Sequence, residues 1–277
     1  MNRSVTRLFP APRQECPLEG LYLDQRLHTR GRRGEPCVYS NFITSLDGRI
    51  AIAGNNRATH MVPAATTNPR DWRLYQELAG QADLLIISGR FVRQSENGEA
   101  QDLLPVGNEP AFADIRDWRL AQGLKPQPDI AIMSANLDLP LAALQPYHRR
   151  RVVVITGDAA GTDRAASLEA AGIAVIRAGA GRQVDGKRMR ERLADDGYTS
   201  IYAIAGPAVF HTLLKANIVD RLYLTTTHQL LGGQNFDTLT RGNLLDPVRN
   251  LHMRELYYDP GTPAGAGQLF GVYESAD

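Results

Sequence analysis

Short apolar runs alternate with segments of helical periodicity along most of the chain. Apolar residues dominate stretches of about four to eight positions that turn-forming residues bound. These stretches are residues 37–44, 82–88, 130–133, 151–156, 174–177, 201–204 and 222–227. Between several of them apolar side chains recur at helical spacing, as in 71–78, where Trp72 and Tyr75 share one side. Strands that alternate with helices predict an α/β fold with a mainly parallel central sheet flanked by helices.

The pattern changes near both ends of the chain. Residues 251–258 and 268–274 have strand character with no helix between them, which predicts a C-terminal antiparallel hairpin at a sheet edge. Residues 1–36 are rich in proline and basic side chains, so we expect an N-terminal arm with little regular structure. Residues 37–277 are then one domain, in which the polar segment 94–128 forms a surface excursion or a lid.

A glycine turn joins a strand to a helix within residues 200–233. Gly206 follows the apolar run 201–204, and Pro207 suits the first position of a helix, where its missing N–H costs nothing. The free amides and the positive dipole end of such a helix bind phosphate readily. The turn alone is a weak motif, because it lacks the full dinucleotide-binding glycine pattern and the lysine of a P-loop. An ordinary strand-to-helix connection is the alternative.

Charge and cysteine content narrow the class of protein. The 277 residues carry 31 basic and 30 acidic side chains, a formal net charge of +1, so nothing favours a nucleic-acid partner. No apolar run approaches the length of a signal peptide core or a membrane span. Two cysteines without metal-ligand spacing fit a reducing compartment. We therefore expect a cytoplasmic protein without a membrane, nucleic-acid or metal partner.

One carboxylate stands at the end of an apolar run. Asp47 lies in Ser45-Leu-Asp-Gly, directly after the predicted strand 37–44. Ligand sites of α/β folds lie at the carboxyl ends of strands, which makes Asp47 a candidate catalytic residue. Asp-Gly is also a strong turn signal, so a purely structural turn is the competing interpretation.

Four short segments in a fixed order resemble a known family. Ser45-Leu-Asp-Gly, Ala205-Gly-Pro, Ile218-Val-Asp and Leu231-Gly-Gly stand in the order found in the pyrimidine reductases of riboflavin biosynthesis. The resemblance covers roughly residues 37–275. That family shares its fold with dihydrofolate reductase, so the resemblance implies a dihydrofolate-reductase-like fold and an NADPH-dependent reductase. It also implies a homodimer that acts on a small pyrimidine or pteridine-like substrate.

The resemblance also assigns residues to the site. The cofactor pyrophosphate would lie on the helix that Gly206, Pro207, Ala208 and Val209 begin. The adenosine side of the cofactor would meet Ser134 and Thr156. The nicotinamide and the substrate would lie near Ser45, Asp47 and Asn56.

This chain departs from the family pattern mainly on the substrate side. Ile204 replaces the usual glutamate before the late glycine turn, and Leu78-Ala-Gly replaces the segment whose arginine contacts the substrate phosphate. Arg90, just past the apolar run 82–88, is the candidate replacement for that arginine. Two alternatives stay open: reduction of dihydrofolate or another pteridine or pyrimidine, and NADPH binding without turnover.

Overall fold

The computed structural model describes residues 4–53, 60–96, 106–147, 149–262 and 265–276. The helices are α1 (Pro69–Gly80), α2 (Gly89–Glu96), α3 (Ala113–Ala121), α4 (Thr162–Ala170), α5 (Gly186–Asp195) and α6 (Pro207–Lys215). The strands are β1 (Ser4–Phe9), β2 (Gln14–Pro17), β3 (Cys37–Ser45), β4 (Ala51–Ala53), β5 (His60–Met61), β6 (Leu84–Ser88), β7 (Asp129–Met133), β8 (Val152–Thr156), β9 (Ala174–Arg177), β10 (Ser200–Ala203), β11 (Arg221–Thr227), β12 (Phe236–Asp237), β13 (Leu251–Asp259) and β14 (Gln268–Ser275).

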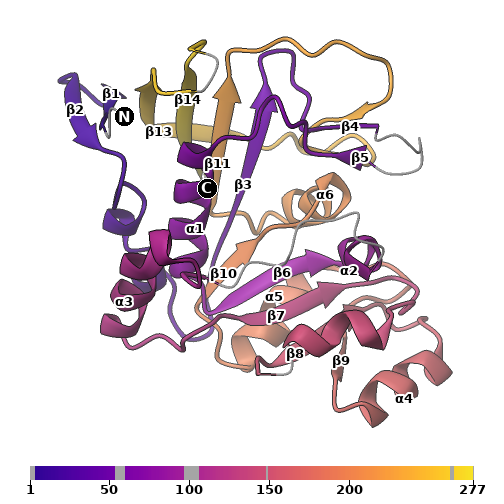
Figure 1. Ribbon diagram of the computed structural model, residues 1–277. Coiled ribbons are helices and arrows are strands. Elements are labelled where there is room, and N and C mark those ends of the chain that lie inside the picture. The colour runs from indigo at the N-terminus through magenta and orange to yellow at the C-terminus, as the bar shows by residue number, and fades with distance from the viewer. Residues whose placement is uncertain (1–3, 54–59, 97–105, 148, 263–264, 277) are drawn as a thin grey trace.

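One sheet of eleven described strands runs through the molecule, in the order β2-β1-β13-β14-β11-β3-β10-β6-β7-β8-β9. The strands from β11 to β9 in this order are parallel, and β14, β13, β1 and β2 extend the sheet in antiparallel fashion. The sheet twists strongly, so β3 and β11 stand upright in Figure 1 while β6 and β7 lie across the view. The predicted mainly parallel α/β fold and its C-terminal hairpin are confirmed.

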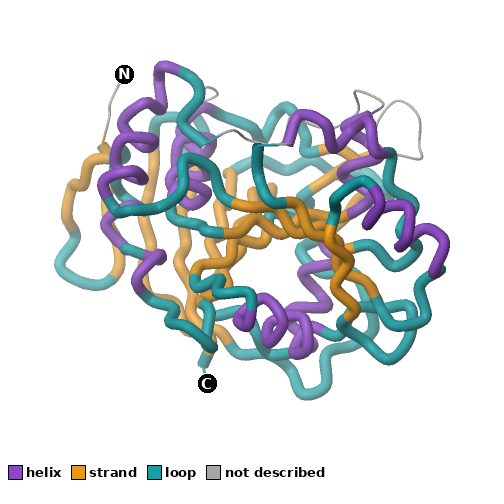
Figure 2. Tube along the Cα trace, turned by 90° about the horizontal axis from the view of Figure 1, so that it is seen from below, coloured by secondary structure: helices purple, strands orange, loops and turns teal. Residues whose placement is uncertain are grey.

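Helices cover both faces of the parallel strands, as Figure 2 shows from below. Leu74 and Leu78 of α1 pack with Tyr39 and Leu85 on one face. Phe210 of α6 packs with Val38 and other side chains on the opposite face. Because both faces are buried, the parallel strands show continuous apolar runs rather than alternation. None of the described helices combines the length and the apolar character that crossing a bilayer requires.

The segment before β3 is more regular than the sequence predicts. β1 pairs with β13 and β2 pairs with β1, so residues 4–17 extend the sheet as a hairpin. The expectation of little regular structure is wrong here, because the strands are stabilised by pairing with a segment 250 residues away rather than by a local apolar pattern. The polar segment 94–128 likewise contains α3, whose Ile115 is fully buried against the α1 side of the core.

Strand β3 lies in the interior of the sheet, between β11 and β10. Its first four residues, Cys37–Ser40, pair with β10 on one side, and this ladder ends at Ala203. Its other side pairs with β11 from Tyr39 to Ser45. Residues 41–45 therefore have a strand neighbour on one side only. The result is a notch in the sheet between β3 and the point where the chain leaves β10.

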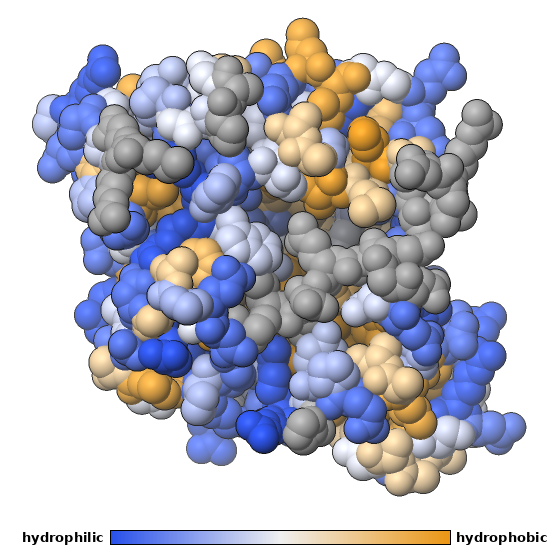
Figure 3. All heavy atoms as spheres, in the orientation of Figure 1, coloured by the Kyte–Doolittle hydropathy of each residue, from blue (hydrophilic) through white to orange (hydrophobic). Residues whose placement is uncertain are grey.

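A second, three-stranded sheet in the order β12-β4-β5 lies beside the far end of β3. Its strands are two or three residues long, which is too short for an alternation signal in the sequence. His60 Nδ1 contacts Asp237 Oδ2 at 2.7 Å and joins β5 to β12. Hydrophobic surface, shown in orange, gathers at the top of the molecule in Figure 3. Leu46 directly after β3, Met61 of β5 and Leu230 are large apolar side chains that are exposed.

Candidate functional site

The carboxyl ends of the parallel strands bring most of the predicted site residues to one edge of the sheet. Asp47 follows β3, Gly206 follows β10, Arg90 follows β6, Ser134 follows β7 and Thr156 ends β8. Neighbouring strands lie about 4.8 Å apart, so these five positions form a row along the edge. Such an edge is where open α/β sheets bind ligands.

The N-terminus of α6 opens onto this edge. Gly206 is the N-cap residue, and no side chain hydrogen-bonds to the cap. Pro207 occupies the first helical position, and the first turn contains no acidic residue. By contrast, Asn68 caps α1 and Asp185 caps α5 through their side chains. The start of α6 therefore keeps an uncompensated positive dipole end, which suits an anion.

Space is also available in front of α6. A Cβ atom added to Gly206 would have no neighbour within 4 Å, and Gly206 and Ala208 are both exposed. The amide of Val209 already bonds to the Gly206 carbonyl oxygen at 3.1 Å. Within the described residues the Ala208 amide has no backbone acceptor, so it is the first helical N–H available to a ligand.

Backbone groups of β3 face the notch beside α6. The Cys37 amide bonds toward β10, to the Thr199 carbonyl oxygen, while the Val38 carbonyl oxygen accepts from Asp220 at the start of β11. Since bonding alternates along a strand, the amide and carbonyl of Ile43 point toward the β10 side, where the ladder has ended. Ile43 and Asn41 remain partly exposed although β3 is a central strand. The β10 side of Ile43 thus has no strand partner, and the side chains of Asn41 and Ile43 are accessible in part.

Ser134 and Thr156 lie farther along the edge. A Cβ on Gly89, the first residue of α2, would lie 3.1 Å from Ser134 Oγ, so α2 begins directly against the end of β7. The Ser134 hydroxyl accepts from the Leu137 amide at 3.1 Å. Thr156 Oγ1 is buried and has no hydrogen-bond partner among the described residues. Arg90 follows Gly89 and is exposed, and the strand order puts this position next to the end of β7 and two strands away from the end of β3, where Asp47 lies.

Asp47 joins two loops at the end of β3. It accepts hydrogen bonds from the Ser45 hydroxyl and from the amides of Leu231 and Gly232, and it pairs with Arg49. The hydroxyl of Ser45, followed by these amides and Arg49, lowers the pKa of Asp47 to about 2. Asp47 is therefore ionised near neutral pH and suits a positioning role better than proton donation.

Ser45 is itself part of this turn. Its side chain is buried, donates to Asp47 and accepts from the Arg49 amide at 3.1 Å. Gly48, in the same turn, has a φ of +82° that L side chains rarely adopt. The Ser45 hydroxyl thus makes its hydrogen bonds to Asp47 and to the Arg49 amide, within the turn. Asn56, predicted to bind substrate, lies outside the described residues.

Asp47→Asn is expected to lower turnover at least tenfold while NADPH affinity changes less than about threefold, because a neutral amide accepts the Ser45, Leu231 and Gly232 hydrogen bonds more weakly. The two loops beside the notch then lose their common anchor, whereas the α6 N-terminus is untouched. Steady-state kinetics and NADPH fluorescence titration measure the two quantities. Glu35→Gln, in an exposed ion pair with Arg32, is the control. Wild-type turnover in Asp47→Asn would leave Asp47 only its turn role.

A second carboxylate, which the sequence patterns did not single out, lies on the α1 face of the notch. Asp71 is in the first turn of α1, and Thr225 of β11 donates to its Oδ1 at 2.6 Å. Protein atoms surround Asp71 closely, yet its side chain is partly exposed. Burial raises the pKa of Asp71 to about 6, and the Thr225 hydrogen bond offsets part of that effect.

Aromatic side chains surround Asp71. Tyr75 lies one helical turn beyond it, and Trp72 stacks on Tyr75 with ring centroids 5.3 Å apart. Tyr75 also meets Tyr202 of β10 edge-on at 5.7 Å, and the Tyr202 hydroxyl donates to Asn41. Trp72, Tyr75 and Ile204 are only partly buried. The α1 face of the notch thus has apolar walls and one carboxylate.

Arginines near this carboxylate are engaged elsewhere. Arg70 contacts Asp259 at 2.7 Å, and Arg73 pairs with Glu77 and Asp114. Position 79, where the resemblance would place an arginine for the substrate phosphate, is a buried alanine. Among the described residues, no group of three His, Cys, Asp or Glu side chains could hold a metal ion.

Comparison with known proteins finds one matching family model and several similar solved structures. A family model described as the RibD C-terminal domain matches residues 36–259. Among solved structures, the chain is similar to a pyrimidine reductase-like protein from Corynebacterium diphtheriae, with 21% identity and a TM-score of 0.66, covering 88% of this chain and 93% of that one. A search of curated proteins gave no match.

Two longer proteins show the same fold. RibD from Acinetobacter baumannii has 14% identity and a TM-score of 0.61, over 88% of this chain and 58% of that chain. A diaminohydroxyphosphoribosylaminopyrimidine deaminase/5-amino-6-(5-phosphoribosylamino)uracil reductase from Thermotoga maritima has 11% identity and a TM-score of 0.54, over 92% and 60%. The chain thus spans somewhat more than half the length of these two proteins.

Proposed function

Because the chain belongs to the RibD C-terminal domain family, we propose that it is an NADPH-dependent reductase of the pyrimidine reductase type, as in riboflavin biosynthesis. The observation that carries the proposal is the uncapped N-terminus of α6, which opens beside the notch in β3. A dinucleotide cofactor requires a binding site for its pyrophosphate and, next to it, space for its flat nicotinamide ring.

Three observations fit a dinucleotide along the carboxyl edge. The free Ala208 amide and the open space at Gly206 suit the pyrophosphate, with Pro207 and Val209 fixing the helix start. The backbone amide and carbonyl of Ile43 can bind a carboxamide that enters the notch. The Thr156 hydroxyl, which has no hydrogen-bond partner among the described residues, would lie toward the adenosine side. When bound, NADPH supplies the hydride, and the protein supplies position and electrostatics.

Arg90 carries the proposed preference for NADPH over NADH. NADPH has an additional phosphate on its adenosine ribose, and an arginine near that ribose accommodates the phosphate in dinucleotide sites. Arg90 is exposed at the start of α2, next to Ser134. We therefore assign Arg90 to the cofactor, not to the substrate phosphate as the sequence suggested.

The substrate would lie on the α1 face of the notch, over Ile43 and between Tyr75 and Ile204. Hydride transfer to an electron-poor C=N bond or to an opened ribose carbon needs the acceptor close to the notch. Asp47, through Leu231 and Gly232, would hold the loops that border this space. With residue 79 an alanine, a pteridine without a phosphate is the second candidate substrate.

Assembly and location are also proposals. The family resemblance supports a homodimer in the cytoplasm. Leu244 and Val248, on the extended segment before β13, are 93% and 69% exposed, which suits an apolar contact between copies of the chain.

The proposed function is tested by NADPH binding followed by turnover. The purified protein is expected to quench NADPH fluorescence, to bind NADPH at least tenfold more tightly than NADH, and to oxidise NADPH with 5-amino-6-(5-phosphoribosylamino)uracil, its 2-amino analogue or dihydrofolate. Arg90→Ala should reduce the NADPH/NADH affinity ratio to near one, because one charge-assisted phosphate contact contributes about 1.5–3 kcal/mol. If the protein does not bind NADPH, the proposed reductase function is rejected. If it binds NADPH but oxidises it with none of these compounds, it is an NADPH-binding protein without reductase turnover.

A further inference from the structure

A cavity of about 310 Å³ lies at the amino ends of the parallel strands. Its wall comes from residues at the start of β6, β7, β8 and β10 and from the C-terminal ends of α3 and α5. Parallel strands place their amino and carboxyl ends on opposite edges of the sheet. The cavity is therefore separate from the proposed cofactor and substrate site, and the proposed function does not use it.

Arg119 of α3 forms part of the wall of this cavity. Its side chain is fully buried, and within the described part of the chain it forms no ion pair. Nε donates to the Lys125 carbonyl oxygen at 2.6 Å, and Nη1 donates to the carbonyl oxygens of Gly80 and Ala82. Nη2 is buried and has no hydrogen-bond partner among the described residues. Two N–H donors of a charged group thus lack an acceptor, which is costly in a buried position.

Carboxylates compensate the charge of Arg119 only from a distance. Burial lowers the pKa of Arg119 to about 10, and the charges of Asp83 and Asp129 offset part of that effect. Asp83 accepts its own hydrogen bonds from the amides of Thr199 and Ser200. With a pKa of about 10 the guanidinium stays charged near neutral pH. What Arg119 lacks is therefore an acceptor for Nη2 and not a proton.

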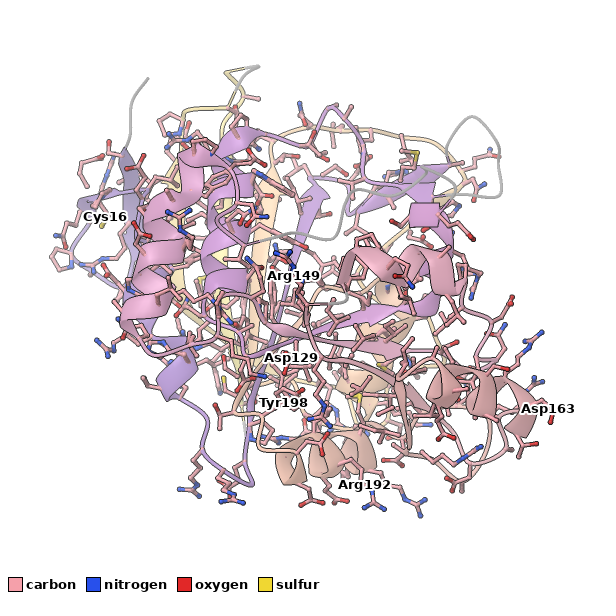
Figure 4. The ribbon with its side chains drawn as sticks, turned by 60° about the horizontal axis from the view of Figure 1, so that its bottom comes forward. Cys16, Asp129, Arg149, Asp163, Arg192 and Tyr198 are labelled. Atoms are coloured by element: carbon pink, nitrogen blue, oxygen red, sulfur yellow. The ribbon has the colours of Figure 1, made fainter. Side chains whose placement is uncertain are left out.

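Two partly exposed cations line the same cavity. Lys125 Nζ contacts Asp129 Oδ2 at 2.7 Å, and Arg151 Nη2 contacts Asp196 Oδ2 at 2.7 Å. The Tyr198 hydroxyl also donates to Asp129, and the two side chains lie next to each other in Figure 4. An ammonium group has three donors and a guanidinium has five, so both cations keep donors beyond their ion pairs. Such exposed ion pairs contribute little to stability, so a ligand can share these cations at little cost.

The charges around the cavity favour an anionic oxygen group as its ligand. Three cations and three carboxylates line the wall: Arg119, Lys125, Arg151, Asp83, Asp129 and Asp196. Arg150 adds a fourth cation nearby, because burial and, to a smaller extent, the charge of Arg119 lower its pKa to about 10. Nη2 of Arg150 is also buried without a partner among the described residues. Donors of charged groups form their strongest hydrogen bonds with ionised oxygens, which makes a carboxylate or a phosphate a better occupant than a neutral carbonyl.

We propose that this cavity binds the carboxylate or phosphate group of a small molecule, with Arg119 Nη2 as the buried anchor and Lys125 and Arg151 as partly exposed partners. Leu124 and Tyr198 add carbon surface to the wall, against which the rest of such a molecule can pack. The proposal goes beyond the proposed function and does not depend on it, because no residue of the cavity belongs to the cofactor or substrate site.

Isothermal titration calorimetry of the full chain with inorganic phosphate, ribose 5-phosphate and benzoate tests the site. The titrations use Gly206→Asp as background, because this change removes the anion site at the start of α6 and leaves the far edge of the sheet unaltered. Sodium chloride keeps the ionic strength at about 0.15 M, so that general screening is constant. At least one probe is expected to bind once per chain with a Kd of about 1 mM or lower.

Two variants in this background test the residues. Lys125→Gln combined with Arg151→Gln should weaken binding at least tenfold, because two charge-assisted hydrogen bonds are replaced by neutral ones. Arg188→Gln combined with Arg254→Gln removes two exposed, ion-paired cations elsewhere and should leave the Kd within about twofold. Arg119→Lys keeps the positive charge but removes Nη2, and should also weaken binding at least tenfold. Thermal unfolding shows whether this variant folds; if it does not, the first double variant decides.

The outcomes separate the two ligand groups and can reject the site. Binding of the two phosphates without benzoate assigns a phosphate, and binding of benzoate alone assigns a carboxylate. If no probe binds, the cavity is not an anion site. An unchanged Kd after both glutamine substitutions in the wall, or an equal loss in the control, overturns the proposal. None of these results bears on whether the chain reduces a substrate with NADPH.

Discussion

Gly206→Asp should weaken NADPH binding at least 100-fold while the protein stays folded and becomes slightly more stable. Aspartate is a favoured N-cap residue, so its carboxylate would accept from the free Ala208 amide and add a few tenths of a kcal/mol relative to glycine. A Cβ atom at this position has no neighbour within 4 Å, and the N-cap φ of −67° suits any residue. The same carboxylate would occupy the anion seat and repel a pyrophosphate.

Gly206→Asn separates the effect of the negative charge from the effect of a side chain that fills the anion site. Asparagine has the same size and caps the same amides without a charge, so its loss of NADPH affinity should be at least tenfold smaller. Fluorescence titration gives the affinities, and thermal unfolding shows that each variant is folded. Wild-type affinity in Gly206→Asp would mean that the cofactor does not lie on α6, and equal losses in both variants would remove charge as the cause.

Asp71→Asn should stabilise the protein at neutral pH and lose that advantage in acid. Burial raises the pKa of Asp71 to about 6, against about 3.9 in an unfolded chain. Above pH 6 the native state bears the cost of an ionised buried carboxylate, and below pH 4 the residue is protonated in both states. The penalty therefore grows as pH rises from 4 to 6, and at pH 7.5 it amounts to about 1–3 kcal/mol.

Urea unfolding at pH 7.5 and at pH 4.0 measures this difference. The free energy of unfolding of Asp71→Asn minus that of wild type should be positive at pH 7.5 and should shrink to a few tenths of its value at pH 4.0. Asp163→Asn, at an exposed position, is the control for a general effect of removing one charge. A difference that does not depend on pH would show that Asp71 titrates normally in the native state.

Much of the fold followed from periodicity within short windows. The apolar runs at β6, β7 and β8 are buried on both faces, and such runs carry their signal locally. The helix at α6 was equally evident, because Pro207 and the apolar spacing of Val209 to Leu214 mark its start and its buried face. The hairpin β1–β2 was not, because its pairing partner β13 lies at the other end of the chain.

The site was less predictable than the fold for the same reason. Asp71 matters because Thr225, 154 residues later, bonds to it, and nothing near Asp71 in the sequence signals that contact. Asp47 was found from its Asp-Gly turn, but its low pKa depends on amides near residue 231. The sequence marks Arg90 as a cation past a strand end, but only the strand order shows that this end lies beside β7 and two strands away from β3.

Strand β3 has a consequence for how this protein tolerates change over evolution. Residues 37–40 are buried and pair with β10, so substitutions there should be selected against through the amount of folded protein in the cell. Phe42, Thr44 and Ser45 are buried as well, whereas Asn41 and Ile43 are partly exposed beside the notch, where a different side chain can alter what is bound at a smaller cost in folding. Within one nine-residue strand, inherited variation is thus expected to be conservative at the buried positions and to track substrate choice at these two.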